Sequence, residues 1–211
     1  MSMKNRIYMF EGCDRTGKST FIKFLKNDFI RIGLNPVIFH LTGPPKFEGL
    51  NLTNCIEKSL MQLVKFDDEY KLFREILNEN MNNIIILDRT SFGEYVWSRY
   101  WNRIGCYTDY IMSNMFNSKN QDLFDQTKYI YYWMSDVNCL KQRILESPED
   151  EQIFTLNNRT ITENIQYVYN MYENLNKMIK SYFNSYKEID SSQFKSISDI
   201  PKYIENDFYS V

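Results

Sequence analysis

The chain has 211 residues and a formal net charge of −2 at pH 7, a length that suits one domain with a sizeable apolar core. This charge supplies no general attraction to nucleic acid, so an anionic ligand would have to be held by a local group of residues. Because no stretch of about 18 apolar residues is present, we expect no transmembrane helix.

Short apolar runs alternate with longer amphipathic segments along the chain, a pattern typical of strand–helix units around a parallel sheet. We expect five strands, at residues 7–10, 37–40, 84–87 and 129–134 and in a weaker run that ends at Ile189. The run at 84–87 is continuously apolar, as a strand covered on both faces should be. The sequence therefore predicts an α/β fold in which helices flank both faces of a parallel sheet.

Between these strands we expect helices at residues 18–32, at 68–79, from about residue 91, and at 162–182. Gly33 and Pro36 would end the first helix, and apolar residues recur every three or four positions in the last one. No repeat or linker divides the chain, so residues 1–211 are expected to form a single domain. The acidic segment 146–155, with one proline and no clear period, is the candidate for a mobile lid.

Directly after the first expected strand, the chain matches G-x-x-x-x-G-K-[ST] with Gly12-Cys13-Asp14-Arg15-Thr16-Gly17-Lys18-Ser19, followed by Thr20. In such a loop, backbone N–H groups and the N-terminus of the next helix cradle a phosphate. Lys18 would bridge the β- and γ-phosphates, and the Ser19 hydroxyl would bind Mg²⁺. The alternative, an ordinary glycine turn, does not explain why a strand precedes the motif and a helix follows it.

The third expected strand ends in Asp88 and Arg89. A carboxylate there can bind Mg²⁺ or accept the acceptor's proton, and the guanidinium can hold a phosphate. The alternative is that both residues only cap the next helix. A GTPase switch is not indicated, because neither N-K-x-D nor D-x-x-G after the third strand is present.

Phe10-Glu11 before the loop, the loop itself and Asp88-Arg89 together resemble the thymidylate kinase group and its phage-encoded deoxynucleotide kinase relatives. The resemblance implies the strand order 2-3-1-4-5, with ATP and Mg²⁺ at the carboxyl ends of the strands. In eukaryotic-type thymidylate kinases, an arginine in this loop stabilises the transferring phosphoryl group, and the lid has no basic residues. The resemblance implies the same role for Arg15. Residues 146–152 indeed carry no positive charge. Alternatively, Arg15 is simply solvated.

The same resemblance implies a set of binding residues. Asp14 would lie near the acceptor's 3′-hydroxyl, and Tyr70 and Arg74 would contact its base. The two are four residues apart and so share one helix face. The alternative is that Tyr70 lies in the core and Arg74 in solvent. Arg143 and the loop at Ser191 would contact the nucleotide, and Tyr172 would contact the acceptor. A plain turn also explains Ser191.

One departure concerns the end of the second strand, which lacks the arginine that holds the acceptor's phosphate in this group. His40, Lys46 or Arg89 would have to replace it. If none does, the acceptor is an unphosphorylated nucleoside. The glutamate base usual at this strand end in deoxynucleoside kinases is missing too, so the sequence leaves the acceptor open.

These patterns predict a P-loop phosphotransferase that uses ATP and Mg²⁺ to convert a thymidylate-like deoxynucleoside monophosphate to the diphosphate. The first alternative is a deoxynucleoside kinase acting on a 5′-hydroxyl, and the second is a regulatory ATPase. We expect a small nucleotide substrate rather than nucleic acid or a membrane; a homodimer stays open. Four scattered cysteines without a C-x-x-C pair indicate reduced thiols in the cytoplasm, which is the host cytoplasm for a phage-encoded protein.

Overall fold

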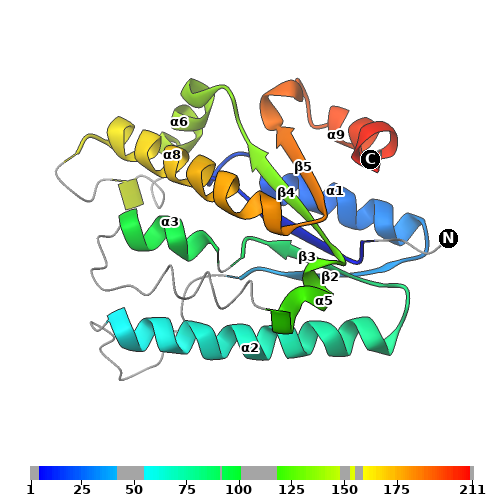
Figure 1. The fold of residues 1–211 in the computed structure, drawn as a ribbon. Coiled ribbons are helices and arrows are strands. Elements are labelled where there is room, and N and C mark those ends of the chain that lie inside the picture. The colour runs from blue at the N-terminus through cyan, green and yellow to red at the C-terminus, as the bar shows by residue number, and fades with distance from the viewer. Residues whose placement is uncertain are drawn as a thin grey trace.

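The computed structural model describes residues 5–41, 55–90, 92–100, 118–147, 153–154 and 159–209. At its centre, five parallel strands form one sheet in the order β2-β3-β1-β4-β5 (Figure 1). This arrangement confirms the predicted α/β fold and its strand order.

The strands are β1 (Ile7–Glu11), β2 (Asn35–Phe39), β3 (Asn83–Asp88), β4 (Thr127–Trp133) and β5 (Ser185–Asp190). Their ends lie within two residues of the predicted ends. The central strands β1 and β3 are buried at every position, because both of their faces are covered by helices. The edge strand β2 is more exposed, with Val37 and Ile38 each 37% exposed.

The described helices are α1 (Lys18–Arg31), α2 (Cys55–Glu79), α3 (Gly93–Tyr100), α5 (Gln121–Phe124), α6 (Val137–Leu145), α8 (Ile161–Ile179) and α9 (Asp199–Tyr203). One apolar cluster joins α1 and α9 to one face of the sheet, through residues such as Phe21, Ile86 and Ile200. A second cluster joins α2, α3, α6 and α8 to the other face. Figure 1 shows these helices on the two sides of the strands.

Helix α2 is longer than the sequence predicted, since it begins at Cys55 rather than near Asp68. No glycine or proline occurs between Cys55 and Glu79, so nothing in the chain prevents the helix from starting well before Asp68. Helix α8 starts one residue before its predicted start and ends at Ile179, where a 3₁₀ turn (Lys180–Tyr182) follows.

Because all five strands are parallel, their carboxyl ends lie at one edge of the sheet. The segments that follow β1, β2, β3 and β5 carry the phosphate loop, His40, Arg89 and Ser191, respectively. The fold therefore gathers most of the predicted functional residues at this edge. Of the predicted lid, the structure describes only residues 146–147 and 153–154.

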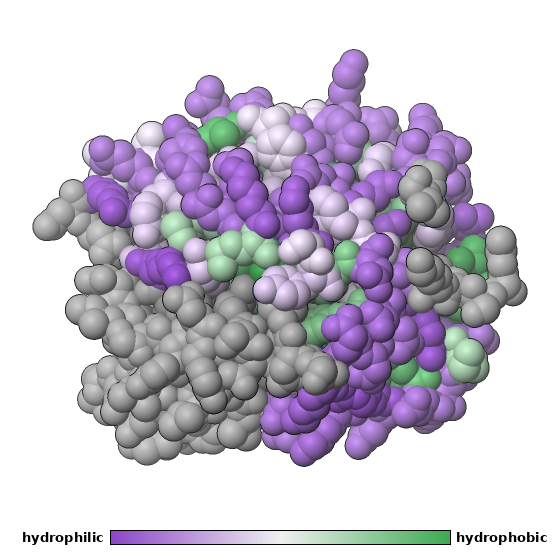
Figure 2. All heavy atoms as spheres, viewed as in Figure 1, coloured by the Kyte–Doolittle hydropathy of each residue, from purple (hydrophilic) through white to green (hydrophobic). Residues whose placement is uncertain are grey.

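No helix in the described part of the chain is both long and apolar enough to cross a bilayer. Figure 2 shows that hydrophilic side chains cover most of the described surface on that face of the molecule.

Candidate active site

The phosphate loop joins β1 to α1 in a conformation that requires glycine at both of its ends. Gly12 has a φ of 145°, and a Cβ built there would lie 1.9 Å from the carbonyl oxygen of Tyr132. Gly17 has a φ of 94° and forms the N-cap of α1. The first turn of α1 has no acidic residue and no side-chain cap, so its positive dipole end remains suited to an anion.

Lys18 lies inside this loop rather than in solvent. Its side-chain nitrogen donates to the carbonyl oxygens of Gly12 and Cys13, each at 3.2 Å, and the residue is only 5% exposed. Burial lowers the pKa of Lys18, while the carboxylates of Asp88 and Glu11 oppose this shift. The loop thus holds an ammonium group where a bound phosphate would need positive charge.

Ser19 and Asp88 bring two oxygens together beside the loop. The Ser19 hydroxyl donates to Asp88 Oδ2 at 2.7 Å, and His40 Nδ1 lies 3.5 Å from the same oxygen. Asp88 Oδ1 is buried and has no hydrogen-bond partner among the described residues.

This pair fits Mg²⁺, which usually takes one or two protein oxygens and completes its shell with phosphate and water. In the described part of the chain, no group of three or more histidine, cysteine or carboxylate side chains forms a ready metal site. A bound Mg²⁺ would therefore depend on the nucleotide for its remaining ligands.

Two arginines at this edge adopt the left-handed backbone conformation, Arg15 with a φ of 60° and Arg89 with a φ of 70°. No other non-glycine residue in the described segments has a positive φ. The Arg89 guanidinium forms an ion pair with Asp14. The Arg15 guanidinium donates to the Ser147 hydroxyl at 2.6 Å.

The predicted nucleotide contact Arg143 is also brought to the phosphate loop. It lies near the end of α6, and its Nη1 donates to the carbonyl oxygen of Arg15 at 3.3 Å. The same nitrogen lies 4.0 Å from the position that a Cβ of Gly17 would occupy. The end of α6 is thus docked against the loop.

The loop after β5 meets the loop after β4 at the same edge. The carboxylate of Asp190 accepts hydrogen bonds from the N–H groups of Ser135 and Ser192, both at 2.9 Å. Ser191 begins a 3₁₀ turn and is 8% exposed.

The phosphate-loop segment contains two further predicted nucleotide contacts. Thr20 is exposed on α1, and Cys13 is buried in the phosphate loop. Contacts of these residues with a nucleotide stay predictions.

The predicted base-contacting pair on α2 is engaged by protein groups. Tyr70 is 5% exposed and packs against Phe73 and Phe124, a core position. Arg74 donates to both carboxylate oxygens of Asp122, at 2.9 and 2.8 Å. Asp122 lies in α5, just before β4, and so at the amino edge of the sheet. The structure separates Arg74 from the phosphate loop, and a role for it in acceptor binding stays a prediction.

Glu11 is a site residue that the sequence placed in the motif before the loop without assigning it a role. This last residue of β1 is fully buried, and its Oε1 accepts hydrogen bonds from the backbone N–H of Thr90, at 2.7 Å, and from the Thr90 hydroxyl. Burial raises the pKa of Glu11 to about 7. A charged residue at the end of an otherwise apolar strand was the available signal.

Helix α8 contributes Tyr172 to the same region. The residue is 1% exposed, and its hydroxyl lies 3.5 Å from the position of a Cβ on Gly93, the first residue of α3. Tyr172 is therefore buried next to the segment that follows Arg89. Its direct contact with an acceptor stays a prediction.

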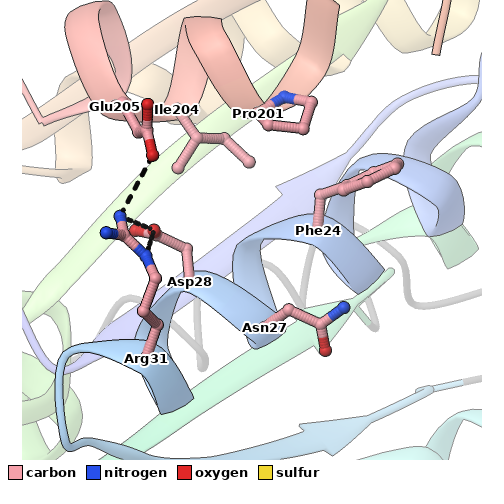
Figure 3. Close-up of a pocket in the computed structure, with 7 residues that line it drawn as sticks. All are labelled: Phe24, Asn27, Asp28, Arg31, Pro201, Ile204 and Glu205. Carbon is pink, nitrogen blue, oxygen red and sulfur yellow. Dashed lines mark hydrogen bonds and ion pairs between the residues drawn. The ribbon is translucent and has the colours of Figure 1, made fainter. Parts of the chain in front are cut away.

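A shallow pocket elsewhere on the surface does not belong to this site (Figure 3). It lies between the second half of α1 and residues 201–205, which belong to α9 and the turn that follows it, and Arg31 bridges its rim through Asp28 at 2.5 Å and Glu205 at 3.3 Å. Arg31 is at the far end of α1 from the loop, about 20 Å away at 1.5 Å per residue. The pocket beside Arg31 therefore lies outside the candidate active site.

No protein-family model matches the sequence, and none of the curated proteins matches it either. Solved structures do match. The deoxyadenosine kinase from M. mycoides with bound dCTP superposes with a TM-score of 0.59 at 17% identity, covering 97% of this chain and 100% of that chain. The chain has the fold of these P-loop kinases. The same enzyme with dATP gives a TM-score of 0.58 at 17% identity, covering 98% and 100% of the two chains.

A third structure, that kinase with the products dCMP and a flexible dCDP, gives a TM-score of 0.54 at 16% identity and covers 96% of this chain and 97% of that one. All three are structures of one deoxyadenosine kinase. They support the P-loop kinase fold and do not confirm the narrower resemblance to thymidylate kinases.

Proposed function

We propose that this protein is an ATP- and Mg²⁺-dependent deoxynucleoside kinase that transfers the γ-phosphoryl group to a 5′-hydroxyl. The observation that carries the proposal is the meeting of a phosphate loop, its buried Lys18, and the Ser19–Asp88 pair at one edge of the sheet. These are the parts that phosphoryl transfer requires, because its catalysis consists mainly of positioning and charge stabilisation.

The donor side follows from the loop. Lys18 and the N-terminus of α1 would hold the phosphates of ATP, and Ser19 and Asp88 would hold Mg²⁺. Mg²⁺, when bound, neutralises charge on the β- and γ-phosphate oxygens. Arg15 lies in the same loop, and its guanidinium would leave Ser147 to face the transferring group.

The acceptor side is argued from charge. A monophosphate carries a charge of about −2 at neutral pH, so binding it requires cations without anionic partners. Of the described cations that the sequence assigns to the acceptor, Arg89 is paired with Asp14 and Arg74 with Asp122. His40 faces Asp88. This balance of charge favours an uncharged nucleoside over its monophosphate.

The comparison supports the same choice of acceptor, because the three matching structures are of a nucleoside kinase and one of them holds dCMP as a product. Asp88 is either a Mg²⁺ ligand or the group that receives the hydroxyl proton. Its Oδ1, buried and without a partner in the described part of the chain, is the oxygen available for the second role.

The test is an assay of the purified protein with Mg-ATP and a panel of ribonucleosides, deoxynucleosides and their monophosphates. We expect phosphorylation of at least one deoxynucleoside and none of the monophosphates. Products from monophosphates alone would establish a monophosphate kinase instead. ATP hydrolysis that no acceptor stimulates would favour a regulatory ATPase.

A further inference from the structure

Glu11 connects the phosphate loop to the turn that carries Asp88 and Arg89, the predicted acidic and basic catalytic residues. It is the residue immediately before Gly12, and both hydrogen bonds to its Oε1 come from Thr90. Thr90 in turn follows Asp88 and Arg89 directly. The link spans 79 positions of the sequence, so it exists only in the folded chain.

This link continues the connection between β1 and β3 beyond the point where their ladder ends. The last paired residues are Phe10 and Asp88, and the N–H of Arg89 donates to the carbonyl oxygen of Phe10 at 3.1 Å. The Glu11–Thr90 bonds follow on the other side of Arg89. The left-handed conformation of Arg89 is thus fixed by a hydrogen bond on each side.

A buried carboxylate needs a reason, because it is far more costly to bury than an apolar side chain of the same size. The Oε2 of Glu11 is also buried and has no hydrogen-bond partner among the described residues. It lies 3.8 Å from the position of a Cβ on Gly93. The polar contacts that Glu11 makes are therefore concentrated on Thr90.

We propose that Glu11 is a positioning residue that, through Thr90, sets Asp88 and Arg89 at their places beside the phosphate loop. The proposal rests on the proposed function for its catalytic consequence. Because Asp88 lies beside Ser19, its position also determines how much Mg²⁺ increases the affinity for ATP.

The test compares two buried threonines. Thr90→Val removes the hydroxyl that donates to Glu11. Thr127→Val removes a hydroxyl that donates to the carbonyl oxygen of Leu123 at 2.7 Å, at the amino edge of the sheet. Both residues are at least 95% buried, with exposures of 5% and 1%. Thr90→Val loses the hydroxyl bond to Glu11 and the bond that this hydroxyl accepts from the N–H of Phe92, and it keeps the backbone N–H bond to Glu11. Thr127→Val loses one buried hydrogen bond and leaves both bonds to Glu11 in place.

We expect Thr90→Val to lower kcat about tenfold, as a displaced catalytic group would, and to raise the KM for ATP, because Mg²⁺ then strengthens ATP binding less. Thr127→Val should keep the wild-type kcat and KM even where it lowers the thermal midpoint. Thr90→Ser retains the donor and should restore wild-type kinetics. If Thr90→Val and Thr127→Val have equal kcat and KM values, the Glu11–Thr90 bonds only stabilise the core, and the proposal is overturned.

A second readout needs no acceptor. The affinity for a fluorescent ATP analogue is measured with and without Mg²⁺, and the gain due to Mg²⁺ should fall about fivefold or more in Thr90→Val alone. If the wild type phosphorylates no acceptor, the proposed function fails, and this measurement still decides the role of Glu11. An unchanged Mg²⁺ gain in Thr90→Val would then overturn it.

Discussion

Arg15 and Arg89 illustrate how single residues shape the candidate active site. Each has a positive φ angle, 60° and 70°, a conformation that costs a non-glycine residue about 1–2 kcal/mol. Such a cost persists only where surrounding contacts impose it, and such residues gather at functional sites. Arg15 is held by Arg143 through its carbonyl oxygen and by Ser147 through its guanidinium. Arg89 is held by Asp14.

At this scale we expect Lys18→Ala and Arg15→Ala each to lower turnover about 100- to 1,000-fold, because each removes a cation that the proposed function places beside the transferring phosphoryl group. Steady-state kinetics with the best acceptor measure the effect. Lys23→Ala is the matched control, since Lys23 is exposed on the same helix. Near-wild-type turnover in Arg15→Ala would contradict the role assigned to that residue.

Glu11 gives a prediction about pH. Burial raises its pKa to about 7 from 4.5, so the folded state binds the proton more tightly than the unfolded state does. The stability that this group contributes is fully present below about pH 4.5 and is lost as pH rises through 7. In the Glu11→Gln variant, which does not titrate, this loss is absent.

The measurement is urea unfolding of the wild type and Glu11→Gln from pH 4.5 to 8. The difference between their free energies of unfolding should change by about 3 kcal/mol over this range, in the direction that favours Glu11→Gln at high pH. The charges of Lys18 and Arg89 oppose the shift and are the same in both proteins. Parallel pH profiles would show that Glu11 titrates normally.

At the scale of elements, the starts of helices show what local sequence controls. Thr160 is the N-cap of α8: its hydroxyl accepts from the N–H of Glu163 at 3.3 Å, and the Glu163 carboxylate accepts from the N–H of Thr160 at 2.8 Å. This capping box lies within two residues of the predicted start of the helix. Helix α2, in contrast, continues through Asp68, where its start was expected.

The capping box yields a stability prediction. Thr160→Ala should lower the free energy of unfolding by about 1 kcal/mol, because an N–H group at the start of α8 loses its partner. Chemical denaturation measures the change. Thr162→Ala is the control, since Thr162 is exposed in the same helix and alanine there favours the helix slightly. Equal effects of the two substitutions would argue that the cap contributes nothing.

At the scale of the whole molecule, the order of the strands decides which segments become neighbours. The placement of β1 between β3 and β4 puts the phosphate loop beside Asp88 on one side and beside the segments that follow β4 on the other. In the proposed function, the pairing of cations with carboxylates favours an uncharged acceptor over a monophosphate. The acceptor panel described above tests this pattern of charge.

The sequence by itself determined the strands, the phosphate loop and the residues that could bind ATP, because these follow from local spacing and from hydrophobic periodicity. Tertiary structure alone decided the partners of individual side chains. Glu11 meets Thr90 across 79 positions, and Arg74 meets Asp122 across 48. Such pairs depend on which elements pack together, and no local pattern records that.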